Sequence, residues 1–93
     1  MIYEMLSEGA ENARTGKEIC KQLKITARDL TAAVEQERRQ GRPICASNGS
    51  TPGYFLAANQ DEMQSYCRRL LHRAGEIHKT RSACIKTINK LPL

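Results

Sequence analysis

The feature of this sequence that most constrains its fold is a run of two helical patterns and two short strand patterns. The first helical pattern spans Thr15 to Leu23 and the second spans Ala27 to Gln40, with only Lys24-Ile25-Thr26 between them. Gly41 follows, and two β-like segments then flank Asn48-Gly49. The order is therefore helix, tight turn, second helix and hairpin, which places the amino-terminal end of the second helix at the molecular surface.

Capping residues stand at both predicted helix starts. Thr15, with Glu18 three residues later, predicts a capping box for the first helix. Thr26 can cap the second helix, and Asp29 complements the positive helix end. Gly41 is placed to end that helix in a left-handed conformation. Apolar residues recur at helical spacing behind these caps: Ile19, Cys20 and Leu23 in the first pattern, then Leu30, Ala33 and Val34 in the second.

The segment before these helices is predicted to be helical too. Ile2, Met5 and Leu6 are three or four residues apart, which predicts a first helix ended by Gly9.

Two strands are predicted after Gly41, at 43–47 and 53–57, joined by a polar hairpin tip from Asn48 to Pro52. Side chains alternate along a strand, so Tyr54 and Leu56 should lie on one face and Phe55 on the other.

The last third of the chain predicts one long helix capped by Asn59. Its apolar or small residues alternate in steps of three and four, apart from a gap filled by Arg81, which is the spacing of a coiled-coil seam. The predicted seam is Met63, Cys67, Leu70, Ala74, Ile77, Cys84 and Ile88. A helix over 60–88 would be about 43 Å long at ~1.5 Å per residue, which is too long for a small domain to cover. The far half should lie on a partner, fold back at Gly75 or stay exposed.

Charge divides the 93 residues unevenly. The net charge is +5, with −3 over residues 1–13, +4 over 14–42, none over 43–58 and +4 over 59–93. A basic surface favours polyanions such as DNA. We expect one domain over 1–58 and a C-terminal helical dimerisation segment over 59–93.

Several classes of protein are not supported by the sequence. The four cysteines, at 20, 45, 67 and 84, form no CxxC pair, and neither Cys67–His72 nor His78–Cys84 has the spacing of two ligands on one helical turn. We expect neither a metal nor another cofactor. No oxyanion motif or glycine-rich phosphate loop is present, so we do not expect an enzyme. The acidic start and the absence of a long apolar run predict a cytoplasmic protein with reduced thiols and no membrane segment.

These patterns predict a mainly α winged helix-turn-helix: three helices, a two-stranded β-hairpin wing and a long C-terminal helix. The helix that begins after Thr26 is then the candidate reading helix. Arg28 could donate two bonds to a guanine edge, Thr31 and Ala32 could touch a thymine methyl, and Glu35 could accept from a cytosine amine. The alternative is that these residues are only the solvent-exposed side of an amphipathic helix and make no specific contact.

Further candidate contacts to DNA lie around that helix. Thr26, at the start of the reading helix, is a candidate contact. Thr15 and Lys17 begin the preceding helix, whose free N–H groups suit a phosphate. Arg38 and Arg39 could contact phosphates or complement the negative end of their own helix. At the hairpin tip, Asn48 and Ser50 are polar but uncharged, so a wing built from them would hold DNA only through hydrogen bonds.

The same residues carry a resemblance to a known family. The segments Thr15–Leu23, Ile25–Leu30, Arg38–Ile44 and Gly53–Leu56 resemble the winged helix-turn-helix of biotin-repressor-type DNA-binding domains. More narrowly, Pro43–Ser47 and Pro52–Ala57, with Arg73-Ala74-Gly75-Glu76-Ile77, are similar to small prophage-type helix-turn-helix proteins of Firmicutes. The resemblance implies duplex DNA binding through the helix carrying Arg28, with a phage or transcriptional role. Two departures are the uncharged wing and Glu37, which stands where the family usually has leucine and which we expect at the surface.

The sequence therefore predicts a sequence-specific double-stranded DNA-binding protein, a prophage-type transcriptional regulator that acts as a homodimer through its C-terminal helix. Two alternatives stay open: a protein-interaction adaptor on a winged-helix scaffold, and an accessory protein that bends DNA in excision or replication.

Overall fold

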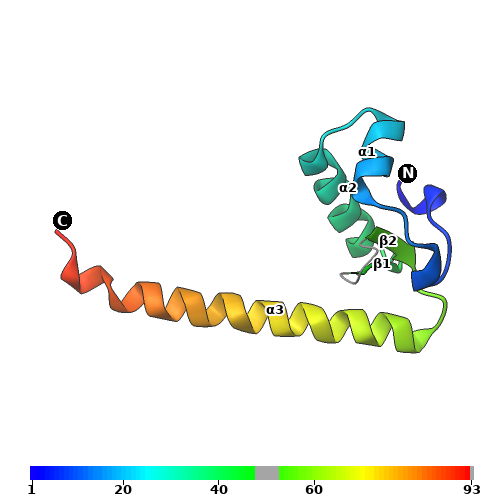
Figure 1. The fold of residues 1–93 in the computed structure, drawn as a ribbon. Helices are drawn as coiled ribbons and strands as arrows, with labels where there is room; N and C mark the ends of the chain where they lie inside the picture. Colours follow the sequence, from blue (N-terminus) through cyan, green and yellow to red (C-terminus); the bar gives the residue numbers. More distant parts are fainter. Residues whose placement is uncertain (48–52, 93) are drawn as a thin grey trace.

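Residues 1–47 and 53–92 are described in the computed structural model, and they form a mainly helical fold with one small antiparallel sheet (Figure 1). The α-helices of this part are α1 (Gly16–Leu23), α2 (Ala27–Arg39) and α3 (Gln60–Lys86). The strands β1 (Ile44–Ser47) and β2 (Gly53–Leu56) pair in a register that sets Cys45 opposite Phe55. Short 3-10 turns cover Tyr3–Met5, Ala10–Asn12 and Ile88–Lys90.

The helices begin where the capping residues predict. Thr26 forms a complete capping box: its Oγ1 accepts from the Asp29 N–H at 3.0 Å, and its own N–H donates to the Asp29 carboxylate at 3.3 Å. Asn59 accepts from the Glu62 N–H at 3.0 Å and starts α3. Thr15 accepts from the Glu18 N–H, but the return bond of the predicted box to Glu18 is absent from the described part of the chain.

Two residues with positive φ end the first two helices. Lys24, at φ 57°, closes α1 and begins the turn into α2. Gly41, at φ 95°, follows α2, as the sequence predicts. Left-handed backbone at these points stops helical hydrogen bonding and reverses the chain.

The prediction of a helix before Gly9 is wrong. Only Tyr3–Met5 forms a single 3-10 turn, because the following residues pair with the sheet instead. The Leu56 N–H donates to the Ser7 carbonyl, and the Gly9 N–H donates to the Leu56 carbonyl, both at 2.9 Å. Arg14 exchanges two further backbone bonds with Tyr54. The N-terminal segment thus covers the outer edge of β2, where an isolated short helix would have gained little stability.

The two faces of the hairpin contact two separate apolar clusters. Tyr54 and Leu56 pack against the larger cluster, whereas Phe55 lies in the smaller one, so the predicted alternation is confirmed. The larger cluster is formed by Ile2, Leu6, Ile19, Leu30, Val34 and Ile44. Leu23, predicted to belong to the stripe of α1, is 40% exposed, because α1 ends there and the chain turns away.

Only the first part of α3 packs on the rest of the molecule. Tyr66, 4% exposed, joins Cys45 and Phe55 in the smaller cluster. Arg69 makes a further contact to β1, and the later turns of α3 extend away from the other elements (Figure 1) and pass through Gly75 without a break. The fold-back considered at Gly75 is therefore absent. The molecule is elongated as a result, with extents of 51 × 32 × 28 Å.

Candidate nucleic-acid interface

The outer face of α2 is a solvent-exposed surface next to a tight turn. Leu30 and Val34 point into the larger cluster, which leaves the opposite side of the helix uncovered. The predicted contact residues of this side are all exposed: Thr26, Arg28, Thr31, Ala32, Glu35 and Arg39. We call this set the α2 face.

The side chains of the α2 face differ in the contacts that they make within the chain. The Thr31 hydroxyl donates to the Ala27 carbonyl at 3.1 Å, so its oxygen keeps only acceptor capacity for a ligand. Glu35 lies 4.0 Å from Arg39, one turn later, and both side chains are largely exposed. Such a pair contributes little to stability, so both groups can exchange partners when a ligand approaches.

The start of α1 lies against the base of the hairpin. Lys17 is exposed, and Thr15, Gly16 and Lys17 line a shallow depression together with residues of both strands. Gly53 makes this approach possible, because a Cβ there would lie 2.5 Å from the Arg14 carbonyl oxygen. The first N–H groups of α1 are therefore beside the hairpin, close to one basic side chain.

Arg38 does not belong to this surface, contrary to the prediction. Its Nε donates to the Ile44 carbonyl at 2.8 Å, and its guanidinium carbon lies 4.7 Å from the centre of the Tyr66 ring. Arg69 of α3 approaches the same ring at 5.2 Å. A cation held between a carbonyl and an aromatic face ties α2 to β1 and α3 and is not free to bind phosphate.

Glu37 also lies inside, where the sequence predicted a surface position. It is 8% exposed, and its carboxylate accepts hydrogen bonds from the Ile2 and Tyr3 N–H groups at 3.0 and 2.9 Å. The buried carboxylate thus anchors the N-terminal segment to α2 and satisfies two backbone donors. Its position three residues after Val34, on the buried stripe, was the signal for this role.

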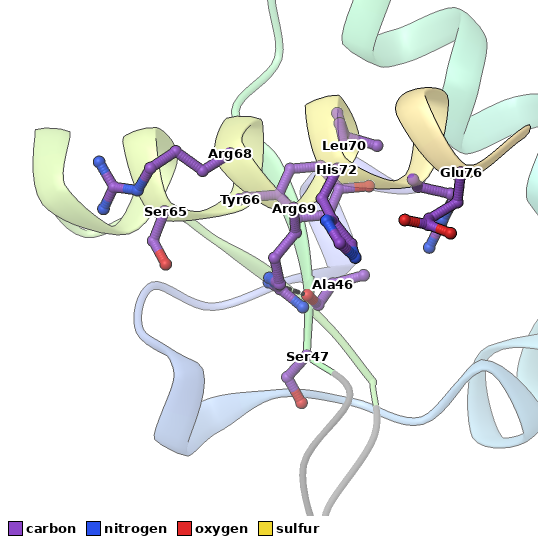
Figure 2. Close-up of a pocket in the computed structure, with 10 residues that line it drawn as sticks. Ala46, Ser47, Ser65, Tyr66, Arg68, Arg69, Leu70, His72 and Glu76 are labelled. Atoms are coloured by element: carbon purple, nitrogen blue, oxygen red, sulfur yellow. Dashed lines mark hydrogen bonds between the residues drawn. The ribbon is translucent and has the colours of Figure 1, made fainter. Parts of the chain in front are cut away.

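A second group of basic side chains lies on α3 beside the end of β1 (Figure 2). Arg68, Arg69, His72 and Arg73 line a hollow with Ser47 and Ser65, and Glu76 stands at its far end. Arg69 is held there by a hydrogen bond to the Ala46 carbonyl. None of these residues was predicted from the sequence to contact DNA.

The predicted seam of α3 is exposed beyond the docked turns. Leu70 is 38% and Ile77 63% exposed, and Cys67, Ala74 and Cys84 are exposed as well. Two members of the seam differ from the prediction. Met63 packs against the smaller cluster of its own chain, and Ile88 lies past the end of α3 in a 3-10 turn, though still exposed.

Cys45 is the most protected thiol among the described residues. It is buried beside Met63 and Glu62, and burial, together with the Glu62 charge, raises the pKa of the Cys45 thiol. A thiol in such surroundings stays protonated and unreactive at neutral pH.

The remaining predicted features can be placed briefly. Asn48 and Ser50 lie outside the described residues. Within residues 1–47 and 53–92, no three His, Cys, Asp or Glu side chains come together as metal ligands would. Over the same residues, none of the helices has the length and apolar character needed to cross a membrane. In comparisons with known proteins, no family model, no curated protein and no solved structure matches this chain.

Proposed function

We propose that this chain is a winged helix-turn-helix protein that binds double-stranded DNA with sequence preference, in the manner of a prophage-type transcriptional regulator. The observation that supports this most is the α2 face. Its amino-terminal half follows a tight turn, carries Arg28 and small side chains, and has no other described element over it. A helix of this kind fits the width of a DNA major groove.

Each residue of the α2 face has a role in this proposal. Arg28 donates to a guanine edge, Thr31 and Ala32 allow close approach and contact a thymine methyl, and Glu35 accepts from a cytosine amine. Lys17 and Arg39 contact phosphates, aided by the first N–H groups of α1.

The exposed stripe of α3 supports a homodimer. Leu70, Ala74 and Ile77 form a continuous apolar line that no described part of the same chain covers. Two copies joined through this stripe would present two α2 faces to two DNA half-sites, as is common for helix-turn-helix dimers.

Selection of duplexes from a random pool tests the proposal with the full chain. We expect recovery of a defined motif, arranged as a palindrome if the dimer binds. On the selected duplex, Arg28→Ala should lose about 1–3 kcal/mol of preference for one base pair. Arg68→Ala, an exposed arginine of α3, is the matched control and should keep that preference. Recovery of no motif would count against sequence-specific binding.

A protein-interaction adaptor is the second candidate function, and the same exposed α3 stripe favours it. An apolar helix face binds a partner helix with little dependence on salt, whereas DNA binding weakens steeply as salt rises. Salt dependence of the bound complex therefore separates the two functions.

A further inference from the structure

The two terminal turns of α3 carry opposite charge, and Arg68, Arg69 and Arg73 add positive charge between them. Asp61 and Glu62 lie in its first turn, and the Glu62 carboxylate accepts from the Ala58 and Ala10 N–H groups at 2.8 and 3.2 Å. The bond from Ala10 holds the N-terminal segment, which includes Glu8 and Glu11, beside the first turn of α3. The other end of the helix and the turn after it hold Lys79, Arg81, Lys86 and Lys90.

The exposed apolar stripe of α3 connects these two ends. It passes through Cys67, Leu70, Ala74, Ile77 and Cys84. Near the start of the helix, Tyr66 packs against the hairpin of the same chain. The exposed residues Leu71 and Ile85 widen the stripe along one edge. A covering helix must therefore lie beside the docked domain at one end and reach the basic turn at the other.

We propose that a second copy of α3 covers this stripe in antiparallel orientation. The inference rests on the homodimer of the proposed function and specifies its arrangement. Antiparallel packing places the acidic first turn of each copy beside the basic last turn of the other copy, so the charges of these terminal turns attract. Parallel packing would bring the two basic ends together and set Arg81 against Arg81 in the seam. It would also place both docked domains side by side at the same end of the helix pair.

The heptad spacing restricts the pair to a few registers, and the proposed register is the one that aligns the acidic first turn with the basic segment around Lys86 and Lys90. In an antiparallel pair, layers that alternate between the two seam positions place Cys67 across from the second copy's Cys84 and Ala74 across from its Ile77. Leu70 then faces the second copy's Arg81, whose aliphatic stem covers the leucine while the charged head reaches water.

This arrangement also sets the distance between the two domains. Tyr66, at the docking point, would lie across from Ile85 of the other copy. The two docking points are then roughly 28 Å apart along the helices, at ~1.5 Å per residue. That separation is of the same order as the ~34 Å between successive major grooves on one side of DNA.

Cross-linking through the native cysteines tests the orientation. Cys67 and Cys84 are exposed, whereas Cys45 is buried. We would treat the full chain, Cys67→Ser and Cys84→Ser with a mild oxidant or a short bismaleimide, and identify linked peptides by mass spectrometry. An antiparallel dimer gives a covalent dimer linked through Cys67 and Cys84, and either single substitution abolishes it. Cys20→Ser is the control and should leave the yield unchanged.

The contrary outcomes are distinct. Covalent dimers that persist in both single variants, through Cys67–Cys67 and Cys84–Cys84 links, would show a parallel pair and overturn the inference. A dimer in sedimentation that yields no Cys67–Cys84 link would also overturn it. A 10.5 kDa species alone in sedimentation would remove the dimer itself. DNA binding is measured separately on the same samples, so a monomer that still binds DNA would leave that part of the proposed function standing.

Discussion

Two adjacent charged residues of α2, Glu37 and Arg38, make contacts that hold other elements in place. Glu37 continues the buried stripe of Leu30 and Val34 at helical spacing, so the sequence did contain the signal that it turns inward. It could not show which groups the carboxylate meets, since these are backbone N–H groups 35 and 34 residues away along the chain. Arg38 lies on the Tyr66 ring for the same kind of reason, a long-range contact without a local pattern.

Glu37→Ala should destabilise the fold, because it leaves the Ile2 and Tyr3 N–H groups without their acceptor. The expected loss is about 1–3 kcal/mol in the free energy of unfolding, measured by urea denaturation. Glu35→Ala is the matched control, since Glu35 is exposed and only weakly paired, and it should change stability by less than about 0.5 kcal/mol. Equal effects of the two substitutions would refute the anchoring role of Glu37.

The thiols should differ sharply in reactivity. At neutral pH, and at dilutions where the chain is a monomer, a thiol reagent should modify Cys67 and Cys84 rapidly and Cys45 only after unfolding, as followed by mass spectrometry. Because folding raises the pKa of Cys45, its contribution to stability is complete below the ordinary thiol value of 9.0 and declines as pH rises through the raised pKa. Rapid labelling of Cys45 in the native protein would contradict its burial.

At the level of elements, local signals predicted the boundaries well where a cap or a turn residue determines them. Thr26, Asn59 and Gly41 stand where the structure begins or ends helices. The N-terminal segment was mispredicted because its helical spacing was outweighed by pairing with β2. Spacing reports which side of a segment is apolar, and here Ile2 and Leu6 are buried without forming an α-helix.

Replacing glycine by alanine should have opposite effects on stability at Gly53 and at Gly75. Gly53→Ala pushes a methyl group into the Arg14 carbonyl and should destabilise the fold by about 1–3 kcal/mol, measured by urea denaturation. Gly75→Ala meets open space within a continuous helix and should stabilise α3 by roughly 1 kcal/mol, measured as increased helicity by circular dichroism. Loss of helicity in Gly75→Ala would argue that α3 bends there in solution.

At the scale of the whole molecule, the excess length of the last helix was predictable and its course was not. The seam spacing and the length of the helical pattern over 60–88 indicated a helix longer than its domain, and α3 has that form. Gly75 costs the helix about 1 kcal/mol relative to alanine, and the residues of high helix propensity around it can offset this cost, so the sequence alone did not decide whether α3 is continuous there. The DNA-binding role of the α2 face stays a prediction, because exposure alone is compatible with either partner class.

The dimer should depend on the α3 stripe and not on the charge of the helix in general. Ile77→Lys places a charge in the stripe and should shift sedimentation toward the 10.5 kDa species at micromolar concentration. Ala83→Lys adds the same charge off the stripe and should leave the dimer in place. A dimer that tolerates both substitutions would show that the stripe is not the interface.

DNA binding by the α2 face is tested most sharply by the affinity of the full chain for a labelled duplex as a function of salt, measured by fluorescence anisotropy. If the α2 face and its basic surroundings bind DNA, log K should fall linearly with log salt and drop at least about tenfold between about 50 and 200 mM. Arg28→Ala should lower affinity for the selected duplex more than for a scrambled one. Absence of binding at low salt, or binding that does not change with salt, would contradict the account.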